Sequence, residues 1–485
     1  MEMDAGNPQP IAAPARGQCC FHRASRLPVS AEALAAWHFR SGALQRLLPP
    51  WLSLEVLQEA SPLANGATAV IRARLGPCTT SVTASHHGVV EGQQFVDVQE
   101  RGPFRSWSHA HRFLTVDSHH AMLEDSIRFD PPFGALGRAL SRRVIQRELA
   151  RQFAFRHART RDDLLRHSDD LTRFGPTRLR IGVTGASGLV GKQLCAFLTT
   201  GGHEVVRFVR GQPGDATERR WNPADVACGL SQESLRDLDA MVHLAGAPIA
   251  ALRWTTRRKR AILESRVQGT KAIAHALARA AVGPKVLVCA SAIGFYGHRG
   301  SEWVDERSAP GQGFLAEVTQ AWESAADEAR AARVRVVHVR VGIVLSSAGG
   351  ALRAMLPAFR CGLGGRVGAG TQGFSWISLD DLLGAILFCL RHPAMEGPVN
   401  AVAPNALTQA EFARTLGRVL RRPTVAPLPS TIVRGVFGEM GNRLLLDGAL
   451  VKPLVLEREG FRFTHASLES ALRLELGRLH SDGLD

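Results

Sequence analysis

The chain has 485 residues, which is enough for two or three domains with buried cores. Hydrophobic residues make up 45% and charged residues 21%, so the composition is that of a folded globular protein and excludes a largely disordered one. The net charge of +15 raises the question of nucleic-acid binding, but the arginines are spread along the whole chain and only five basic residues are lysine. We therefore expect no nucleic-acid partner.

The N-terminal segment 1–17 is polar and contains Pro and Gly, which predicts a disordered tail and no signal peptide. No apolar run in the sequence is long enough to span a membrane. The eight cysteines show no zinc-binding spacing, and several lie in apolar runs, as buried free thiols do. These features predict a cytoplasmic protein in a reducing compartment, with no metal site.

Residues 18–167 have the pattern of a separate α+β domain. A helix is expected over 30–37, and a long amphipathic helix over 136–155 closes the domain. Between them the sequence predicts four β-strands, over 67–75, 94–99, 106–115 and 120–129. The combination of helices with an antiparallel sheet predicts a layered arrangement.

One of these strands carries Trp107, His109 and His111 at alternating positions, so the three side chains share one face. Two histidines one residue apart can bind a metal ion, but two ligands are too few for a site. We therefore interpret this face as part of the domain core or as the wall of a cavity.

A polar segment containing Gly-Pro, at 168–178, predicts a linker. From 179 to 400, apolar β-type runs alternate with helical stretches, which predicts a parallel, doubly wound Rossmann sheet. The expected strands are 180–183, 204–209, 240–244, 285–290 and 334–339. Residues 401–478 are expected to form a small C-terminal lobe, in which Thr408 and Glu411 make a capping box at the start of a helix. The predicted fold class is therefore α/β, with an α+β domain in front.

A glycine-rich turn connects the first of these parallel strands to a helix. It carries Gly185, Gly188 and Gly191 with the spacing of a dinucleotide-binding turn. The first glycine allows the tight turn, the second lets the backbone approach a pyrophosphate, and the third lets the helix pack close to the strand. The alternative is a glycine-rich turn in an enzyme that binds no nucleotide.

The second parallel strand is followed by Arg210, where dinucleotide-binding folds place the residue that contacts the ribose. An acidic residue at this place favours NAD, whereas an arginine suits the 2′-phosphate of NADP. The sequence therefore favours NADP over NAD.

Four motifs of the second half resemble those of the extended short-chain dehydrogenase/reductase superfamily. They are Thr184–Gly191, His243–Gly246, Ser291–Gly297 and Trp376–Asp381. Further segments are similar to the YfcH-type "epimerase family", which has its own C-terminal domain; they include Trp221–Pro223, Leu244–Ile249, Ser265–Thr270, Phe314–Glu317, Gly362–Gly365, Asn400–Pro404 and Gly460–Phe463. The N-terminal domain resembles helix-grip (START-like, SRPBCC) domains through Pro49–Trp51, Phe95–Asp97, Gly102–Phe104 and Phe153–His157.

The resemblance implies an NADP-dependent oxidoreductase or epimerase with a small-molecule substrate. The implied cofactor residues are Gly185, Ser187, Gly188, Leu189, Val190, Arg210, Leu244, Ala245, Gly246 and Arg266, and the implied substrate-side residues are Gln372, Trp376 and Asp380. Arg266 stands where the superfamily often has Asn; it either pairs with a cofactor phosphate or a substrate carboxylate, or lies on a helix surface. Helix-grip domains enclose an apolar cavity, so an apolar ligand of the N-terminal domain is also implied.

The usual catalytic pair of this superfamily, a tyrosine and a lysine four residues apart, is absent from the sequence. The single tyrosine is Tyr296, and Gly300 stands four residues after it. Our hypothesis is that Tyr296 or Glu317 handles the proton and that Ser291 orients a substrate oxygen. The alternative is that Ser291 and Tyr296 only hold their loop, while Glu317 caps a helix or pairs with an arginine.

Two functions are compatible with this sequence. One is an NADP-dependent oxidoreductase or epimerase of atypical mechanism, favoured by the intact substrate segment around Trp376. The other is an NADP-binding sensor without steady turnover, favoured by the missing catalytic pair. A sugar-nucleotide epimerase is a third option, which is hard to reconcile with that absence.

Overall fold

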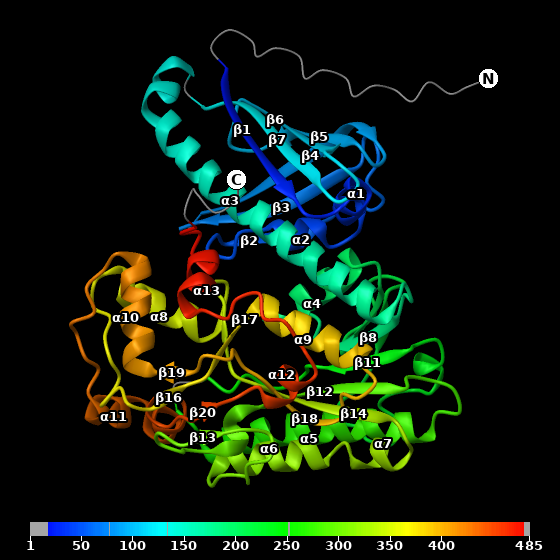
Figure 1. Cartoon of the computed structure of the whole chain (residues 1–485), viewed down its shortest axis with the longest axis vertical. Coiled ribbons are helices and arrows are strands. Elements are labelled where there is room, and N and C mark those ends of the chain that lie inside the picture. The colour runs from blue at the N-terminus through cyan, green and yellow to red at the C-terminus, as the bar shows by residue number, and fades with distance from the viewer. Residues whose placement is uncertain (1–17, 77, 133, 251–252, 480–485) are drawn as a thin grey trace. The chain divides into compact units, whose positions relative to one another are not determined.

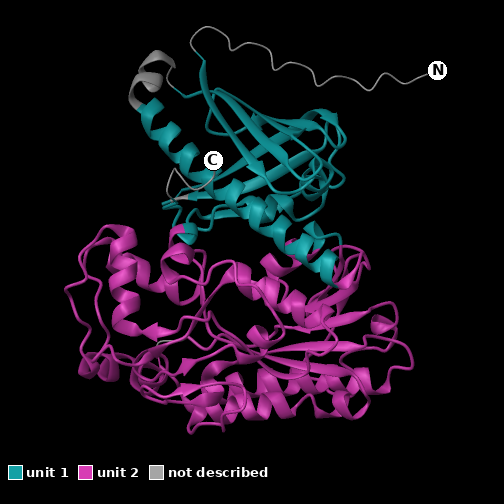
Figure 2. Ribbon diagram, in the orientation of Figure 1, with its two compact units in different colours: residues 1–173, 199–202, 474–485 teal, residues 174–198, 203–473 magenta. Residues whose placement is uncertain are grey.

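The computed structural model describes residues 18–76, 78–132, 134–250 and 253–479. Its contacts divide the chain into two units, shown in Figure 2. The first unit contains the residues up to 173, a short segment at 199–202, and the C-terminal residues from 474 onward. The second unit contains 174–198 and 203–473.

The first unit is built on a seven-stranded antiparallel sheet (Figure 1), with the strand order β1-β7-β6-β5-β4-β3-β2. Its strands are β1 (Cys19–Leu27), β2 (Leu54–Gln58), β3 (Thr68–Leu75), β4 (Cys78–Val90), β5 (Gln94–Arg101), β6 (Ser106–Thr115) and β7 (Ala121–Asp130). Its helices are α1 (Ala31–Phe39), α2 (Ala43–Leu47) and the long α3 (Gly134–Phe174). Residues of α3 and of the inner face of the sheet together enclose a cavity.

All four strands predicted for this unit are present, and the predicted first helix begins after Ser30, whose hydroxyl accepts a hydrogen bond from the Ala33 amide. Strands β1, β2 and β4 were not predicted. The helix predicted over 136–155 continues to Phe174, so the predicted linker at 168–178 begins inside a helix. The polar residues of that stretch had suggested a loop, although a solvent-facing helix end carries the same residues.

The second unit contains a seven-stranded parallel sheet with the strand order β10-β9-β8-β11-β12-β14-β18. Its strands are β8 (Arg180–Thr184), β9 (Glu204–Val209), β10 (Glu218–Arg220), β11 (Ala240–His243), β12 (Val286–Ala292), β14 (Arg335–Val341) and β18 (Gly397–Ala401). Counted along the chain, this order is 3-2-1-4-5-6-7, which is that of a doubly wound Rossmann sheet. All five strands predicted for this part of the chain are therefore present, and the predicted fold class is confirmed.

Helices accompany this sheet along the rest of the chain (Figure 1). They are α4 (Leu189–Thr200), α5 (Thr256–Arg279), α6 (Phe314–Ser324), α7 (Asp327–Ala331), α8 (Gly350–Arg360), α9 (Leu379–Arg391), α10 (Gln409–Leu420), α11 (Ser430–Gly441), α12 (Leu454–Arg458) and α13 (Leu468–Glu475). The capping box predicted for Thr408 and Glu411 is present at the start of α10. Apolar residues of β8, β11, β12 and α9, among them Ile181, Val242 and Leu383, form the largest core of this unit.

The predicted C-terminal lobe shares short strand pairs with the Rossmann part. The pairs are β13 (Trp303–Val304) with β20 (Leu450–Val451) and β16 (Gly373–Phe374) with β19 (Leu407–Thr408); a third pair, β15 (Ile343–Leu345) with β17 (Trp376–Ser378), lies before it in the chain. Because each of the first two pairs has one strand from either side of residue 401, the two parts fold as one unit.

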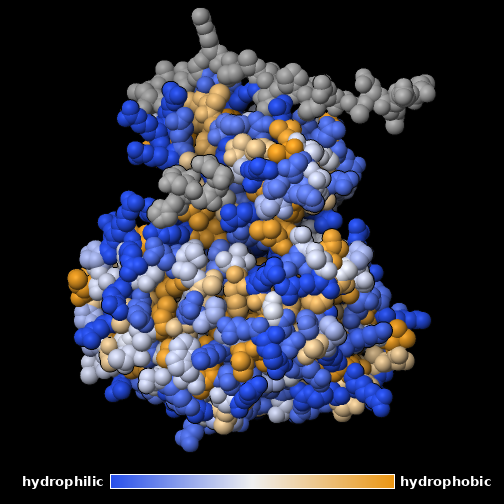
Figure 3. Space-filling view, in the orientation of Figure 1, coloured by the Kyte–Doolittle hydropathy of each residue, from blue (hydrophilic) through white to orange (hydrophobic). Residues whose placement is uncertain are grey.

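Hydrophilic residues cover most of the face seen in Figure 3, and the hydrophobic ones are scattered among them. In the part of the chain that the structure describes, no helix combines the length and the apolar character needed to cross a membrane.

Candidate functional site

The turn between β8 and α4 is built so tightly that side chains are excluded from it. Gly185 has a φ of +71°, and a Cβ on it would lie 2.8 Å from the carbonyl carbon of Leu244. A Cβ on Gly191 would lie 2.1 Å from the carbonyl oxygen of Gly185. Both glycines are therefore required by the backbone packing that the motif predicts.

This turn lies where the strand order reverses, between β8 and β11. The ends of these two neighbouring strands are joined by a hydrogen bond of 2.7 Å between Thr184 Oγ1 and His243 Nδ1. Burial lowers the pKa of His243 to about 3, so its imidazole is neutral. Ligands of open α/β sheets bind in the crevice at such a reversal point.

The predicted cofactor residues converge on this place. Ser187 and Gly188 are exposed, Leu189 and Val190 are half-buried at the start of α4, and the loop Leu244–Gly246 lies beside Gly185. The first turn of a helix presents unpaired N–H groups and the positive end of its dipole, which suit a pyrophosphate. The residues present therefore fit a dinucleotide.

Two arginines at the end of β9 differ in their partners. Arg207 forms ion pairs with Asp215 at 2.6 Å and with Glu218 at 3.4 Å. Arg210 is exposed, and among the described residues its side chain has neither an ion pair nor a hydrogen bond. Arg210 is thus the arginine that remains available for an anion such as a 2′-phosphate.

Arg266 on α5 is buried, so the alternative that it lies on a helix surface is wrong. Its guanidinium donates to the carbonyl oxygens of Ala247 and Ile262, both at 3.1 Å, and stacks 4.9 Å from the ring of Trp322. Burial lowers its pKa to about 10. No carboxylate pairs with it among the described residues, although it lies close to Gly246 of the cofactor loop.

Ser291 and Tyr296 belong to one buried polar network. Ser291 Oγ donates to Glu323 at 2.7 Å, and Arg340 forms two hydrogen bonds of 2.8 Å with the same carboxylate. Arg340 also donates to the hydroxyl of Tyr296 at 3.0 Å, and this hydroxyl donates to Asn400 at 2.8 Å.

Ser291, Tyr296, Glu323 and Arg340 each form a hydrogen bond with another member of this network, and Asn400 also donates to the carbonyl oxygen of Lys452. Burial raises the pKa of Tyr296 to about 12, so its hydroxyl keeps its proton at neutral pH. Arg340 holds the pKa of Glu323 below its ordinary value despite the burial of that carboxyl. These contacts favour the alternative in which Ser291 and Tyr296 hold their loop.

Glu317 lies apart from this network, exposed in the first turn of α6, and no ion pair with an arginine is found for it among the described residues. The predicted substrate-side residues are mostly used by the fold. Gln372 donates to the carbonyl oxygens of Val367 and Leu445, and the fully buried Trp376 donates to that of Asn405. Asp380 is half-buried in the first turn of α9.

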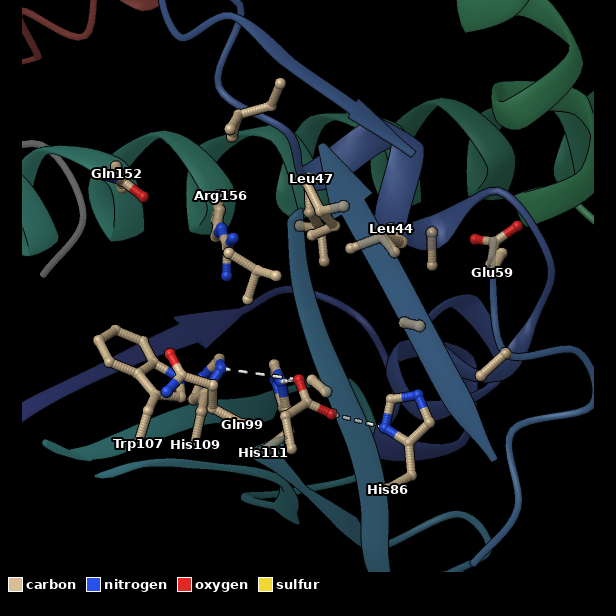
Figure 4. A pocket seen from close by; sticks show the side chains of 18 of the residues that line it. Leu44, Leu47, Glu59, His86, Gln99, Trp107, His109, His111, Gln152 and Arg156 are labelled. Atoms are coloured by element: carbon tan, nitrogen blue, oxygen red, sulfur yellow. Dashed lines mark hydrogen bonds and ion pairs between the residues drawn. The ribbon is translucent and has the colours of Figure 1, made fainter. Parts of the chain in front are cut away.

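The first unit contains a cavity of about 460 Å³ between α3 and the sheet. Apolar side chains such as Leu44, Leu47 and Ile71 line much of it. His109 and His111 lie together at one end, with His86 beside them, and Arg156 reaches from α3 toward the same end (Figure 4). The interpretation of the Trp107, His109 and His111 face as a cavity wall is therefore confirmed.

The sequence did not predict the polar partners of His109 and His111 in the cavity wall, nor those of Ser291 and Tyr296 in the buried network. They are Asp97 and Asp125 in the first unit and Glu323, Arg340 and Asn400 in the second. The alternation of Phe95 with Asp97 was a usable signal, because it puts a carboxylate on the inner face of a strand. Nothing in the sequence tells which neighbouring strand that carboxylate meets.

Comparison with known proteins adds two family models. Residues 181–402 match the NAD dependent epimerase/dehydratase family, and 428–474 match a domain of unknown function named DUF1731. An epimerase family protein of Mycobacterium bovis is 42% identical over 292 residues, which cover 60% of this chain and 96% of that protein. The chain belongs to the epimerase family.

Two solved structures are also similar to this epimerase-family chain. A nucleoside-diphosphate sugar epimerase from Corynebacterium glutamicum is similar with a TM-score of 0.78 and 32% identity, covering 95% of this chain and 91% of that one. Human epimerase family protein SDR39U1, solved with NADPH, has 35% identity and a TM-score of 0.57, covering 62% of this chain and all (100%) of that one. Because the Corynebacterium glutamicum structure covers 95% of this chain, the similarity includes most of the first unit.

Proposed function

We propose that this protein binds NADP(H) at the turn between β8 and α4 and acts as an oxidoreductase of the epimerase family on a small molecule. The observation that carries the proposal is the glycine turn at the point where the strand order reverses, with no space for a Cβ on Gly185 or Gly191. The related human structure, which was solved with NADPH, supports the same cofactor. When bound, the nicotinamide would supply the hydride chemistry.

Arg210 is the proposed contact for the 2′-phosphate, and Arg266 the buried cation near the cofactor loop. The test is a titration of the full-length protein with NADPH and with NADH. We expect Arg210→Ala to weaken NADPH binding at least tenfold and to leave NADH binding nearly unchanged, because only NADPH carries the additional phosphate. Arg207→Ala is the matched control, since that arginine is paired with Asp215 and Glu218. If Arg210→Ala weakened the binding of NADPH and NADH equally, Arg210 would not be the contact for the 2′-phosphate.

Glu317 is the proposed proton-handling group, with Ser291 positioned by Glu323 and Arg340. Glu317 is exposed, whereas the hydroxyl of Tyr296 is buried and bound on both sides. Hydride exchange between the bound nicotinamide and a metabolite extract should decline in Glu317→Gln. The exposed Glu328 on the neighbouring α7 offers a control, Glu328→Gln, which should exchange normally. Equal exchange in both variants would exclude Glu317.

A second candidate function is a sensor that keeps NADP(H) without steady turnover. The closed network of Ser291, Glu323, Arg340 and Tyr296 favours it, because these groups are satisfied by one another. Tight binding of NADPH with no hydride exchange against any extract would support the sensor.

We also propose that the first unit is a helix-grip (START-like) module that binds an apolar small molecule. The antiparallel sheet, the long helix α3 and the cavity lined by Leu44, Leu47 and Ile71 support this role. Saturable binding of a fluorescent apolar probe, lost on filling the cavity with Ala84→Trp, is the expected result. Unchanged binding in that variant would argue against the cavity as the probe site.

A further inference from the structure

Four neighbouring strands of the first unit, β4 to β7, carry polar side chains that lie next to one another. Asp97 on β5 is the register partner of both His86 on β4 and His109 on β6. His111 lies two residues beyond His109 and therefore on the same face, directly opposite Asp125 on β7. The sheet thus brings His86, Asp97, His109 and His111 to the wall of the cavity, with Asp125 behind them.

One donor atom from each of Asp97, His109 and His111 lies within 4.8 Å of the other two. Asp97 Oδ2 is 3.3 Å from Nε2 of His111 and 3.9 Å from Nδ1 of His109. Ligands at about 2.1 Å from a tetrahedral zinc lie roughly 3.4 Å apart. Small side-chain rotations would bring these three atoms to that spacing.

The opposite atoms of Asp97 and His109 are held by hydrogen bonds, and the opposite atom of His111 lies at ion-pair distance from a carboxylate but forms no hydrogen bond among the described residues. Asp97 Oδ1 accepts from His86 at 2.6 Å. His109 Nε2 donates to Asp125 Oδ1 at 2.8 Å, and His111 Nδ1 lies 2.8 Å from the same oxygen. If each ring carries its proton on the nitrogen that faces Asp125, the nitrogen that faces Asp97 is left as a lone-pair donor. An ion at this place would replace the direct hydrogen bond of 3.3 Å between His111 Nε2 and Asp97 Oδ2.

Asp125 is itself anchored from its other side. Its Oδ2 accepts from His157 Nε2 at 2.7 Å, and His157 Nδ1 is 2.8 Å from Ser25 Oγ. Metal-binding histidines in proteins usually have such outer partners, which fix their orientation and tautomer. A buried polar chain of this length on the wall of an apolar cavity is costly unless its charges are compensated.

We propose that Asp97, His109 and His111 bind one divalent transition-metal ion at the polar end of this cavity. Two imidazoles and one carboxylate suit ions such as Zn²⁺, Co²⁺ or Fe²⁺ better than Mg²⁺ or Ca²⁺, which prefer oxygen ligands only. Three protein ligands leave at least one coordination position open, as in catalytic rather than structural sites. This position would face the cavity, where water or an oxygen atom of an otherwise apolar molecule could occupy it.

Arg156 supports the same arrangement. Its Nε is buried without a hydrogen-bond partner among the described residues, and its side chain reaches toward the histidines (Figure 4). The ion would neutralise the carboxylates of Asp97 and Asp125, which leaves the positive charge of Arg156 uncompensated. An anionic oxygen on the metal would therefore be favoured at the open position. The site goes beyond the nicotinamide chemistry proposed above and does not depend on it.

The test uses the full-length protein stripped of metal and titrated with Co²⁺, whose visible absorption reports its coordination. We expect one equivalent to bind with a visible band typical of low coordination number. His109→Gln, His111→Gln and Asp97→Asn should each weaken binding at least 100-fold, and His86→Gln should weaken it 10- to 100-fold by removing an outer partner. His87→Gln is the matched control, because His87 neighbours His86 on β4 but is exposed.

Failure of the wild-type protein to bind one equivalent of Co²⁺ would by itself overturn the proposal. Binding that is equally strong in His87→Gln and in the three ligand variants would also overturn it, because it would come from other histidines. NADPH affinity should stay unchanged in all of these variants, because its proposed site lies in the second unit. Folding of the first unit is checked by circular dichroism and urea unfolding of the full chain, so loss of Co²⁺ binding in a variant with unchanged unfolding reports a lost site and not a misfolded unit.

Discussion

Gly191 occupies a position that no other residue can fill, because a Cβ would lie 2.1 Å from the carbonyl oxygen of Gly185. Relief of that clash must shift either α4 or the turn. We expect Gly191→Ala to lower stability by about 1–3 kcal/mol and to weaken NADPH binding at least tenfold. Calorimetric titration and thermal unfolding measure the two effects. Gly435→Ala is the control, since open space surrounds its Cβ position; it should leave NADPH binding unchanged and, because Gly435 lies inside α11, should not lower stability. Normal NADPH affinity in Gly191→Ala would contradict the proposed cofactor position.

Substitution of Tyr296 tells whether this residue has a structural or a catalytic role in the buried network. Tyr296→Phe removes the hydroxyl that donates to Asn400 and accepts from Arg340. We expect a loss of about 1–3 kcal/mol in the free energy of unfolding, measured with urea, because both partners stay buried without it. Hydride exchange should change less than tenfold. A loss of exchange beyond 100-fold in a fully stable variant would instead make Tyr296 catalytic.

At the scale of elements, α2 and α3 are joined by a buried ion pair. Arg46 and Asp163 have side chains that are 0% and 2% exposed, and two hydrogen bonds of 2.8 and 2.6 Å connect them. Arg46→Met leaves the carboxylate of Asp163 buried without its partner, so we expect a loss of about 3–5 kcal/mol.

The double variant Arg46→Met/Asp163→Leu removes both charges and should recover most of that stability. Urea unfolding of the full chain, followed by circular dichroism, compares the single and double variants. A single variant that loses less than 1 kcal/mol would show that the pair contributes little to the position of α2.

Strands rich in apolar residues were predicted from the sequence, whereas a strand rich in small and polar residues was not. β8, β11 and β12 consist mostly of buried apolar residues, because a parallel strand is covered on both faces, and the sequence predicted all three. β4 instead reads Thr, Ser, Ala and His through much of its length, because its inner face lines a cavity rather than a close-packed core. It was missed for that reason.

The same contrast holds for the candidate sites: a local motif was predicted, and contacts between distant residues were not. The glycine turn is local, so its spacing predicts its shape. The Asp97 and His109 pair depends on the register between β5 and β6, and the Ser291 and Glu323 bond joins residues 32 positions apart. Hydrophobic alternation shows which face of a strand is buried, but it does not tell which residue of another element stands opposite a given side chain.

At the scale of the whole molecule, the two proposed sites belong to different units. The proposed cofactor and proton-handling residues lie between 185 and 317, in the second unit, and the three proposed metal ligands lie between 97 and 111, in the first. A ligand present at 100 times its Kd stabilises the state that binds it by about 2.7 kcal/mol. Hydrogen exchange of amides that open within that unit should slow correspondingly, by about 100-fold.

Mass-resolved hydrogen exchange of the full chain can therefore assign each ligand to its unit. NADPH should slow exchange in the peptides that cover β8, the glycine turn and β11. Co²⁺ should slow exchange in those that cover β4, β5 and β6, because its proposed ligands Asp97, His109 and His111 lie on β5 and β6 and the outer partner His86 lies on β4. In His111→Gln the protection by Co²⁺ should disappear while that by NADPH persists. Protection of β4–β6 by NADPH alone, with no effect at β8, would refute the cofactor assignment and leave the metal proposal intact.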